Sequence, residues 1–173
     1  MKFVECSFEK HGVAILDIFN DAIANSTALY EYKLFAPEKM TSWFADKAAG
    51  RYPVIGAVDS NGVLLGFASY GVFRARPAYK YSVEHSVYVH KDHRGKGVGR
   101  ALLQRIIEAG REQSYHVMIG GIDAENTASI ALHKAFGFVH AGTITQAGFK
   151  FGRWLDLAFY QLTLATPERP VDG

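Results

Sequence analysis

The sequence predicts an α/β fold in a single domain, with a mixed, twisted sheet flanked by helices. Along the chain, segments in which apolar and polar residues alternate, as in strands, are followed by segments in which apolar residues recur at helical spacing. This succession is typical of mixed α/β sheets. The chain has 173 residues, 49% hydrophobic and 21% charged, which suits one full core and leaves too little chain for a second. We expect the domain to cover residues 1–165 and residues 166–173, with their two prolines, to form a loose tail.

The first half of the chain predicts a short strand, two helices and a hairpin. A strand at residues 2–7 precedes a helix at residues 13–23, where apolar residues recur at helical spacing. Aromatic residues follow at 28–36, and Pro37 begins a second helix. Residues 52–58 and 63–70 have strand character, and the intervening Asn61-Gly62 pair is a strong turn signal. These two strands are expected to pair antiparallel.

The second half alternates strands and helices. A loop with two arginines at residues 71–80 leads into a strand at 81–89, a glycine-rich turn and a helix that begins near Val98. An apolar strand at 116–122 and a helix at 126–136 come next, and Gly137 is the expected C-cap of that helix. Strands at 138–144 and 156–164 complete the predicted sheet.

Composition argues against several classes of function. Nineteen Lys and Arg against 17 Asp and Glu give a formal charge of +2, and the basic residues are scattered, so we expect no nucleic-acid partner. Cys6 is the only cysteine, so neither an internal disulfide nor a cysteine zinc site can form. Glu5 and Glu9 lie where a signal peptide needs its apolar core, and no apolar run approaches the ~20 residues of a membrane span. We expect a cytoplasmic protein with no membrane partner.

The turn Arg94-Gly95-Lys96-Gly97-Val98-Gly99 predicts an anion site. Without Cβ atoms, successive backbone N–H groups can converge on one point at the N-terminus of a helix. The phosphate loop of nucleoside triphosphatases is excluded because no Gly-Lys-Ser/Thr ends the turn, and the dinucleotide fingerprint fails because Arg100 replaces its last glycine. From the residues alone the turn is either structural or a phosphate-binding loop.

Two motifs make the chain resemble the GNAT superfamily of acetyl-CoA-dependent N-acetyltransferases. The turn is similar to the pyrophosphate-binding pattern Q/R-x-x-G-x-G/A, and Asn126 and Ser129, followed by Leu-His-Lys-Ala-Phe-Gly-Phe at 132–138, are similar to a second family motif. Residues 81–89 and 148–156 further resemble the phosphinothricin or methionine sulfoximine acetyltransferase subfamily. The resemblance extends from about residue 8 to residue 164.

This resemblance implies a mostly antiparallel sheet that splays open after the strand ending near Val89, at the acetyl-CoA site. It implies acetyl-CoA as cosubstrate, with its pantetheine arm along the strand end and its pyrophosphate on the turn. Asn126 would hydrogen-bond the pantetheine, although an ordinary helix N-cap explains this residue equally well. The implied cofactor-binding residues are Val87, Tyr88, Val89, Arg94, Gly95, Lys96, Gly97, Val98, Gly99, Asn126 and Ser129.

Acyl transfer from a thioester to an amine requires a base for the ammonium, a donor for the oxyanion and often a proton for the leaving thiolate. The resemblance makes Glu84 the expected general base, directly or through a water, and gives a backbone N–H near Val87 to the oxyanion. His133 stands where many superfamily members have a tyrosine near the cofactor sulfur, so it is a candidate general acid or an alternative base. Without the resemblance, Glu84 is a solvated strand residue and His133 a packed or surface helix residue.

Arg74 and Arg76 are the principal candidates for substrate binding. Guanidinium groups bind carboxylate and phosphinate-like oxygens in a bidentate manner, although two loop arginines are otherwise explained by solvation. The resemblance places their loop at the substrate pocket, which a second subunit of a homodimer would complete. The implied pocket residues are Phe35, Arg74, Arg76, Tyr79, Glu84, Lys150 and Trp154.

The expected function is acetylation of the α-amino group of a small anionic amino-acid analogue such as L-methionine sulfoximine or phosphinothricin, with herbicide resistance as the implied cellular effect. The alternatives are a GNAT enzyme acting on another small amine and a non-catalytic acetyl-CoA-binding module. A metal site is a further possibility, because His85, His90 and His93 cluster and His-x-x-His is a ligand spacing. No carboxylate or cysteine motif completes a ligand set, so we expect no metal.

Overall fold

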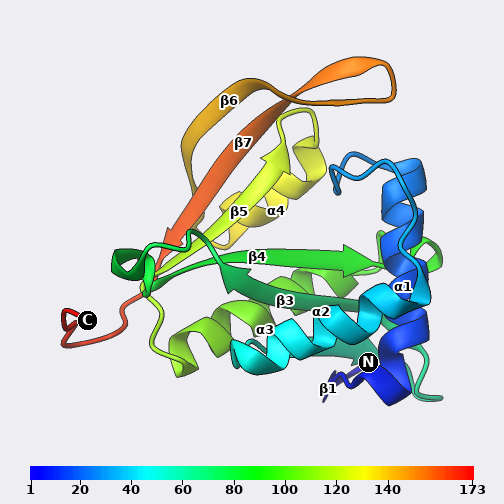
Figure 1. The fold of residues 1–173 in the computed structure, drawn as a ribbon, viewed down its shortest axis with the longest axis horizontal. Helices are drawn as coiled ribbons and strands as arrows, with labels where there is room; N and C mark the ends of the chain where they lie inside the picture. The colour runs from blue at the N-terminus through cyan, green and yellow to red at the C-terminus, as the bar shows by residue number, and fades with distance from the viewer. The chain divides into compact units, whose positions relative to one another are not determined.

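A seven-stranded sheet forms the centre of the computed structural model, which describes residues 1–173 (Figure 1). The strands are β1 (Lys2–Glu5), β2 (Val54–Val58), β3 (Leu64–Val72), β4 (Ser82–Val89), β5 (Val117–Asp123), β6 (Val139–Lys150) and β7 (Arg153–Thr163). Their order is β1-β2-β3-β4-β5-β7-β6. Strands β4 and β5 are parallel, whereas β1–β2, β2–β3, β5–β7 and β6–β7 are antiparallel. The predicted mixed α/β class is confirmed.

The helices are α1 (Phe8–Asn25), α2 (Pro37–Ala49), α3 (Val98–Glu112) and α4 (Thr127–Ala135), with short 3₁₀ turns η1 (Pro77–Tyr79) and η2 (Lys91–His93). Contacts divide this α/β domain into two compact units. The first comprises residues 1–71 and 86–106, and the second residues 72–85 and 107–173. Strand β4 and helix α3 each contribute residues to both units. No helix is both long and apolar enough to cross a membrane.

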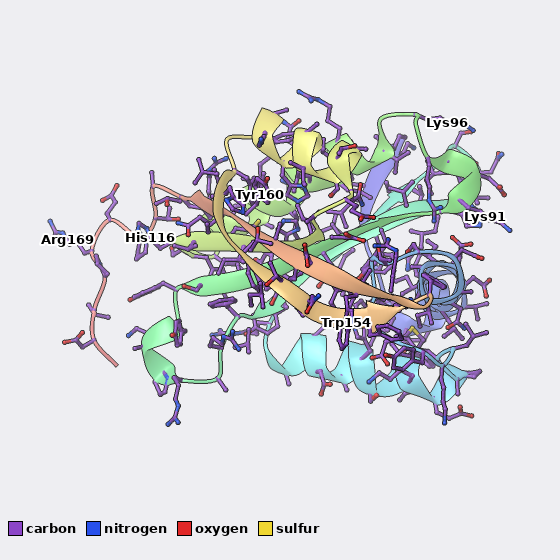
Figure 2. All side chains as sticks on the ribbon, turned by 90° about the horizontal axis from the view of Figure 1, so that it is seen from above. Lys91, Lys96, His116, Trp154, Tyr160 and Arg169 are labelled. Carbon is purple, nitrogen blue, oxygen red and sulfur yellow. The ribbon has the colours of Figure 1, made fainter.

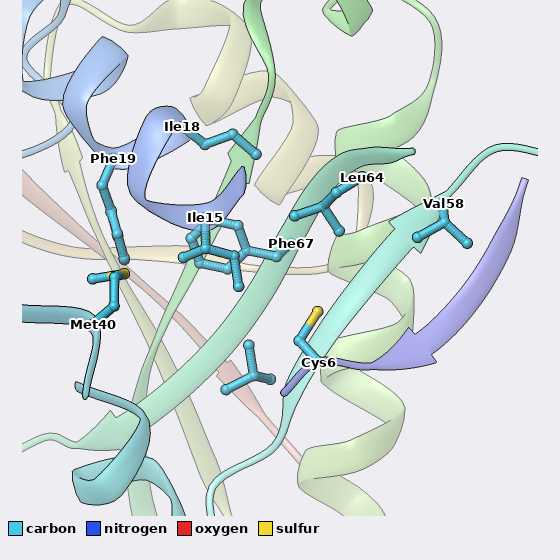
Figure 3. Packing of buried hydrophobic residues seen from close by; sticks show 9 residues of the cluster. Cys6, Ile15, Ile18, Phe19, Met40, Val58, Leu64 and Phe67 are labelled. Carbon is cyan, nitrogen blue, oxygen red and sulfur yellow. The ribbon is translucent and has the colours of Figure 1, made fainter. Parts of the chain in front are cut away.

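The core of the first unit packs one face of α1 against α2 and the strands β2 and β3 (Figure 3). Ser7 is the N-cap of helix α1, and its Oγ accepts a hydrogen bond from the Lys10 N–H at 3.4 Å. Phe19, buried on α1, makes edge-to-face contacts with Phe67 of β3 and Trp43 of α2, at centroid distances of 5.1 and 5.4 Å. This aromatic packing fixes α1 and α2 against the strand pair.

The β2–β3 hairpin has the predicted antiparallel pairing. Gly62 adopts a φ of +83°, the left-handed conformation that glycine provides in tight turns. The Asp59 N–H donates to the Val63 carbonyl at 3.0 Å and closes the turn. The Asn-Gly signal therefore located the turn correctly.

In the second unit, β5 pairs with β7 from Val117↔Thr163 to Asp123↔Leu157, and β6 and β7 form a long hairpin (orange in Figure 1). The predicted strands 138–144 and 156–164 were too short. Strand β6 continues to Lys150 and β7 begins at Arg153, because Phe151 and Gly152 make the turn with φ values of +53° and +73°. In the segment predicted as a tail, the Val171 N–H donates to Tyr81 Oη of this unit at 3.1 Å.

Candidate active site

The glycine turn of the first unit has the backbone geometry expected of an anion site. Gly95 and Gly97 have φ values of +72° and +81°, a conformation that other residues adopt only with strain. A Cβ built on either glycine would meet no atom within 4 Å, so the space over the turn is open. Helix α3 begins at Val98, which puts Val98 and Gly99 in its first turn. The turn therefore lies directly before a helix N-terminus, where backbone N–H groups attract anions.

Arg94 and Lys96 brace this turn. The Arg94 guanidinium donates to the Asp21 carboxylate of α1 at 2.6 Å and, through Nε, to the Val89 carbonyl at 3.2 Å. Burial alone would raise the pKa of Asp21, but hydrogen bonds from Asn25 and Arg94 and the charge of Arg94 lower it overall. The Arg94 guanidinium therefore connects the turn to α1 and to the end of β4.

Lys96 Nζ donates to the Asp92 carbonyl at 2.8 Å and stays exposed. Figure 2 shows Lys96 and Lys91 at the outer side of this segment. Both ammonium groups add positive potential near the turn.

The end of β4 packs within the first unit. Val87, Tyr88 and Val89 are half-buried, and the Tyr88 ring packs against Phe19 at a centroid distance of 5.2 Å. A Cβ on Gly66 of β3 would lie only 2.6 Å from the Tyr88 carbonyl oxygen, so glycine is needed for this approach of the two strands. The side chain of Tyr88 therefore serves the core of the first unit.

In the second unit, the β4–β5 ladder ends at Glu84. The parallel pairing joins Ser82↔Val117, Val83↔Met118 and Glu84↔Ile119 and extends no further, although β5 continues to Asp123. A Cβ on Gly121 would lie 3.2 Å from Glu84 Oε1 and 3.3 Å from Leu157 Cδ1. The missing side chain of Gly121 therefore leaves room for the Glu84 carboxylate. Two consecutive glycines, Gly120 and Gly121, inside an apolar strand indicate that other groups approach its backbone closely, and this sequence signal could have located the neighbours of β5.

The Glu84 carboxyl is half-buried, and burial raises its pKa above the ordinary value. The charge of Arg74 acts in the opposite direction and offsets part of this rise. Arg74 is itself exposed, with its guanidinium 5.2 Å from the centre of the Phe73 ring. The structure thus places two predicted site residues in electrostatic contact. A carboxylate with a raised pKa is a stronger base near neutral pH.

His133 is buried on α4 and meets a second buried histidine, His85 of β4, with their Nε2 atoms 3.2 Å apart. On the other edge of its ring, His133 Nδ1 lies 2.7 Å from the Ser129 carbonyl oxygen. Burial lowers the pKa of both imidazoles, that of His85 to about 3. Both ring nitrogens of His133 are therefore bonded within the protein. His85 was considered only as a metal ligand, and its pairing with His133 was not anticipated.

Asn126 is the N-cap of α4, and its Oδ1 accepts a hydrogen bond from the Ser129 N–H at 3.0 Å. The N-cap interpretation of Asn126 is confirmed. The roles of Asn126 and Ser129 toward pantetheine stay predictions.

The loop after β3 presents the other predicted substrate residues at the surface. Arg76 is exposed directly before η1, and Tyr79 is exposed and packs edge-on against Phe73 at 5.8 Å. On the β6–β7 hairpin, Trp154 is 59% exposed (Figure 2), whereas Lys150 is buried with its Nζ 5.0 Å from the Phe151 ring centre.

Phe35, also predicted for the pocket, belongs to the first unit. Its backbone N–H donates to Asn20 Oδ1 at 2.8 Å, and its carbonyl accepts from Asn20 Nδ2 at 3.1 Å. Its ring packs against Phe19 at 5.7 Å. The segment around Phe35 is therefore held to α1 by both its backbone and its ring.

One half-buried cation, Lys47, lies outside the predicted site. Lys47 of α2 donates to the Tyr70 carbonyl at 2.8 Å and lies over the rings of Trp43 and Tyr52 at 5.4 and 5.8 Å. Burial lowers its pKa to about 8. Lys47 links α2 to the end of β3. No group of three or more His, Cys, Asp or Glu side chains is arranged to hold a metal ion.

Comparison with known proteins gives matches over nearly the whole chain. A model of the acetyltransferase (GNAT) family matches residues 15–138. The L-methionine sulfoximine/L-methionine sulfone acetyltransferase of Pseudomonas aeruginosa is 46% identical over 165 residues, which cover 93% of this chain and 96% of that protein.

Two solved structures show the same fold. A structure from Acinetobacter baylyi ADP1 is 60% identical, with a TM-score of 0.98 over 99% of this chain and 96% of that chain. A GNAT superfamily phosphinothricin acetyltransferase from Sinorhizobium meliloti, crystallised in complex with acetyl-CoA, is 33% identical, with a TM-score of 0.93 over 99% of this chain and 94% of that chain.

Proposed function

The chain belongs to the GNAT family of acetyltransferases, and from this premise we propose that it acetylates the α-amino group of a small anionic amino acid, such as L-methionine sulfoximine or phosphinothricin, using acetyl-CoA. The observation that carries the proposal is the Glu84 carboxylate. It lies against Gly121 at the end of the β4–β5 ladder, its pKa is raised, and Arg74 acts on its charge. These features support Glu84 as the base and Arg74 as an anion-binding group near it.

In the proposed reaction Glu84 accepts a proton from the substrate ammonium, directly or through one water. The amine nitrogen then bonds to the acetyl carbon, the carbon–sulfur bond breaks, and the surplus proton of the attacking nitrogen passes to the thiolate, directly or through a water. A backbone N–H near Val87 would donate to the oxyanion of the tetrahedral intermediate. We assign the base to Glu84 and not to His133, because both ring nitrogens of His133 are already bonded to protein atoms.

Acetyl-CoA supplies the activated acetyl group, and the backbone N–H groups of the glycine turn would hold its pyrophosphate. The open space over Gly95 and Gly97 and the helix N-terminus that follows support this assignment. The backbone from Val87 to Val89, together with Asn126 and Ser129, would hydrogen-bond the pantetheine arm. Lys96 would add positive charge, and Arg94 would hold the shape of the turn through Asp21.

Arg74 and Arg76 would bind the carboxylate and the second anionic group of the substrate. Their exposure in one loop, with Arg74 acting on the charge of Glu84, supports this role. The remaining pocket residues proposed are Phe35, Tyr79, Lys150 and Trp154.

We further propose a homodimer that works in the cytoplasm without nucleic-acid or membrane partners. The β6–β7 hairpin supports the dimer because it exposes large apolar side chains, which monomeric surfaces seldom gather. These side chains are Ile144, Phe149, Phe151 and Trp154. Sedimentation velocity would test the assembly, and a single species of 19.1 kDa would contradict it. Acetylation of phosphinothricin by this enzyme would account for herbicide resistance.

A substrate panel tests the function. Release of free thiol from acetyl-CoA is followed with L-methionine sulfoximine, phosphinothricin and spermidine as acceptors. The proposal expects turnover of the two anionic amino acids and little with the polyamine. Turnover of spermidine alone would favour a GNAT enzyme for another amine. Thiol release that never exceeds background with any amine would favour a non-catalytic acetyl-CoA-binding module.

A further inference from the structure

The buried histidine pair of the second unit has a defined geometry. His85 and His133 are only 6% and 5% exposed, and their ring planes lie 19° apart. The ring centroids are 5.1 Å apart and the two Nε2 atoms 3.2 Å apart, so the nearly parallel rings are offset and approach each other through their Nε2 atoms. Phe138 packs edge-on against both imidazoles, with centroid distances of 5.5 and 5.0 Å. The pair is therefore enclosed and linked by one nitrogen–nitrogen hydrogen bond.

The partners of these nitrogens determine where the protons lie. A carbonyl oxygen only accepts, so the 2.7 Å contact with Ser129 O requires a proton on His133 Nδ1. Burial keeps His133 neutral, and its Nε2 then carries a lone pair. His85 must donate its own Nε2–H to that lone pair. His85 Nδ1 is consequently left without a proton, and it is a buried side-chain nitrogen with no hydrogen-bond partner.

The reversed arrangement does not fit these surroundings. If His133 donated from Nε2 as well as from Nδ1, it would be a buried imidazolium with no carboxylate among its contacts. His85 Nδ1 would then hold a buried N–H without an acceptor. The neutral pair, with His85 as donor, leaves only a lone pair unsatisfied.

Gly120 of β5 makes room for this contact. A Cβ there would lie 3.0 Å from His85 Nε2 and 3.4 Å from His133 Nε2. The neighbouring Gly121 makes room for the Glu84 carboxylate in the same way. Gly121 thus makes room for the proposed base Glu84, and Gly120 makes room for the histidine pair.

We infer that His85 is a positioning residue that acts through His133: its Nε2–H occupies the His133 Nε2 lone pair and holds that ring on the Ser129 carbonyl. This inference rests on the proposed function, because its consequence for catalysis is that His133 exchanges no proton with the substrate. Ser129 also donates its backbone N–H to the N-cap oxygen of Asn126, so the pair steadies the first turn of α4. Through that turn, His85 supports residues proposed to bind the pantetheine arm.

Nitrogen-15 NMR of the histidine rings tests the proton positions in the wild-type protein. Protonated and unprotonated ring nitrogens differ strongly in chemical shift, and the His133→Gln and His85→Gln variants assign the two rings. The inference expects His133 to be protonated on Nδ1 and His85 on Nε2 at neutral pH. A proton on His133 Nε2 would overturn it.

Kinetics of two variants at His85 test the consequence for the reaction. His85→Gln keeps an N–H donor at a similar reach, whereas His85→Leu keeps an apolar volume without a donor. We expect kcat/KM for acetyl-CoA to stay within about threefold of wild type for the glutamine variant and to fall about tenfold for the leucine variant, the scale of one buried hydrogen bond. Equal kcat/KM for the two variants, whether normal or reduced, would contradict a donor role.

The two experiments separate this inference from the proposed function. If the wild-type enzyme acetylated no amine, the proposed function would fail, and NMR would still decide the proton positions. If NMR showed other proton positions on His85 and His133 while the enzyme acetylated methionine sulfoximine, only the inference about His85 would fail.

Discussion

Replacing Gly97 with valine tests the glycine turn, and Gly62 provides a matched control. Gly97 and Gly62 have φ values of +81° and +83°, and a Cβ on either would meet no atom within 4 Å. Each valine variant should therefore lose a similar free energy of unfolding, roughly 1–2 kcal/mol, from forcing an L-residue into the left-handed conformation. Only at Gly97 does the added side chain occupy the space proposed for pyrophosphate.

The assay is calorimetric titration with acetyl-CoA, combined with urea unfolding of both variants. We expect the Kd of Gly97→Val to rise at least about tenfold, which corresponds to about 1.4 kcal/mol, while Gly62→Val binds like wild type. Wild-type affinity in the Gly97 variant would refute the placement of the pyrophosphate. An equal loss of affinity in both variants would show that backbone strain, and not the site, causes the effect.

Three further predictions follow from the charges and burial of particular side chains. Arg74→Gln removes the positive charge that lowers the pKa of Glu84, so the acid limb of the pH profile of kcat/KM should move to higher pH. Arg76→Gln should leave the midpoint of that acid limb in place. An unchanged midpoint in Arg74→Gln would contradict the electrostatic effect of Arg74 on Glu84. Burial, followed by the negative charge of Glu5, raises the pKa of the Cys6 thiol to about 12. A thiol reagent should therefore label Cys6 only after the protein unfolds, and rapid labelling of the folded protein would contradict this. Folding lowers the pKa of Lys47 from 10.5 to about 8, so the unfolded chain binds more protons between these pH values and the free energy of unfolding rises with pH. In urea unfolding, wild type should gain about 1–2 kcal/mol relative to Lys47→Met between pH 8 and pH 10. The same pH dependence in both proteins would contradict the burial of the Lys47 charge.

The features predicted correctly from the sequence depend on local chemistry. The glycine turn before α3, the Asn61-Gly62 hairpin and the helix that begins at Pro37 each follow from backbone preferences within a few residues. The mixed sheet followed from the alternation of strand and helix patterns. These preferences act at short range, so they are visible in the sequence itself.

The features that were missed depend on residues far apart in the chain. Phosphate binding by Arg94 stays a prediction, but its ion pair with Asp21, 73 residues away, was not anticipated. His85 and His133 are separated by 48 residues and meet only once β4, β5 and α4 have assembled. The length of the β6–β7 hairpin was underestimated because the strand pattern is interrupted between Ile144 and Gly148, where the pairing register shifts and Gln146 has a φ of +55°.

The measurement that tests the central claim most directly is the initial rate of thiol release from acetyl-CoA with L-methionine sulfoximine, compared between wild type and Glu84→Gln. The buried Cys6 contributes no background to a thiol assay of the folded protein. The account predicts clear turnover by wild type and a loss of roughly 10²-fold or more in kcat for the variant, with acetyl-CoA affinity nearly intact, because glutamine keeps the shape of glutamate but cannot accept the proton. Wild-type turnover by Glu84→Gln at neutral pH would contradict it.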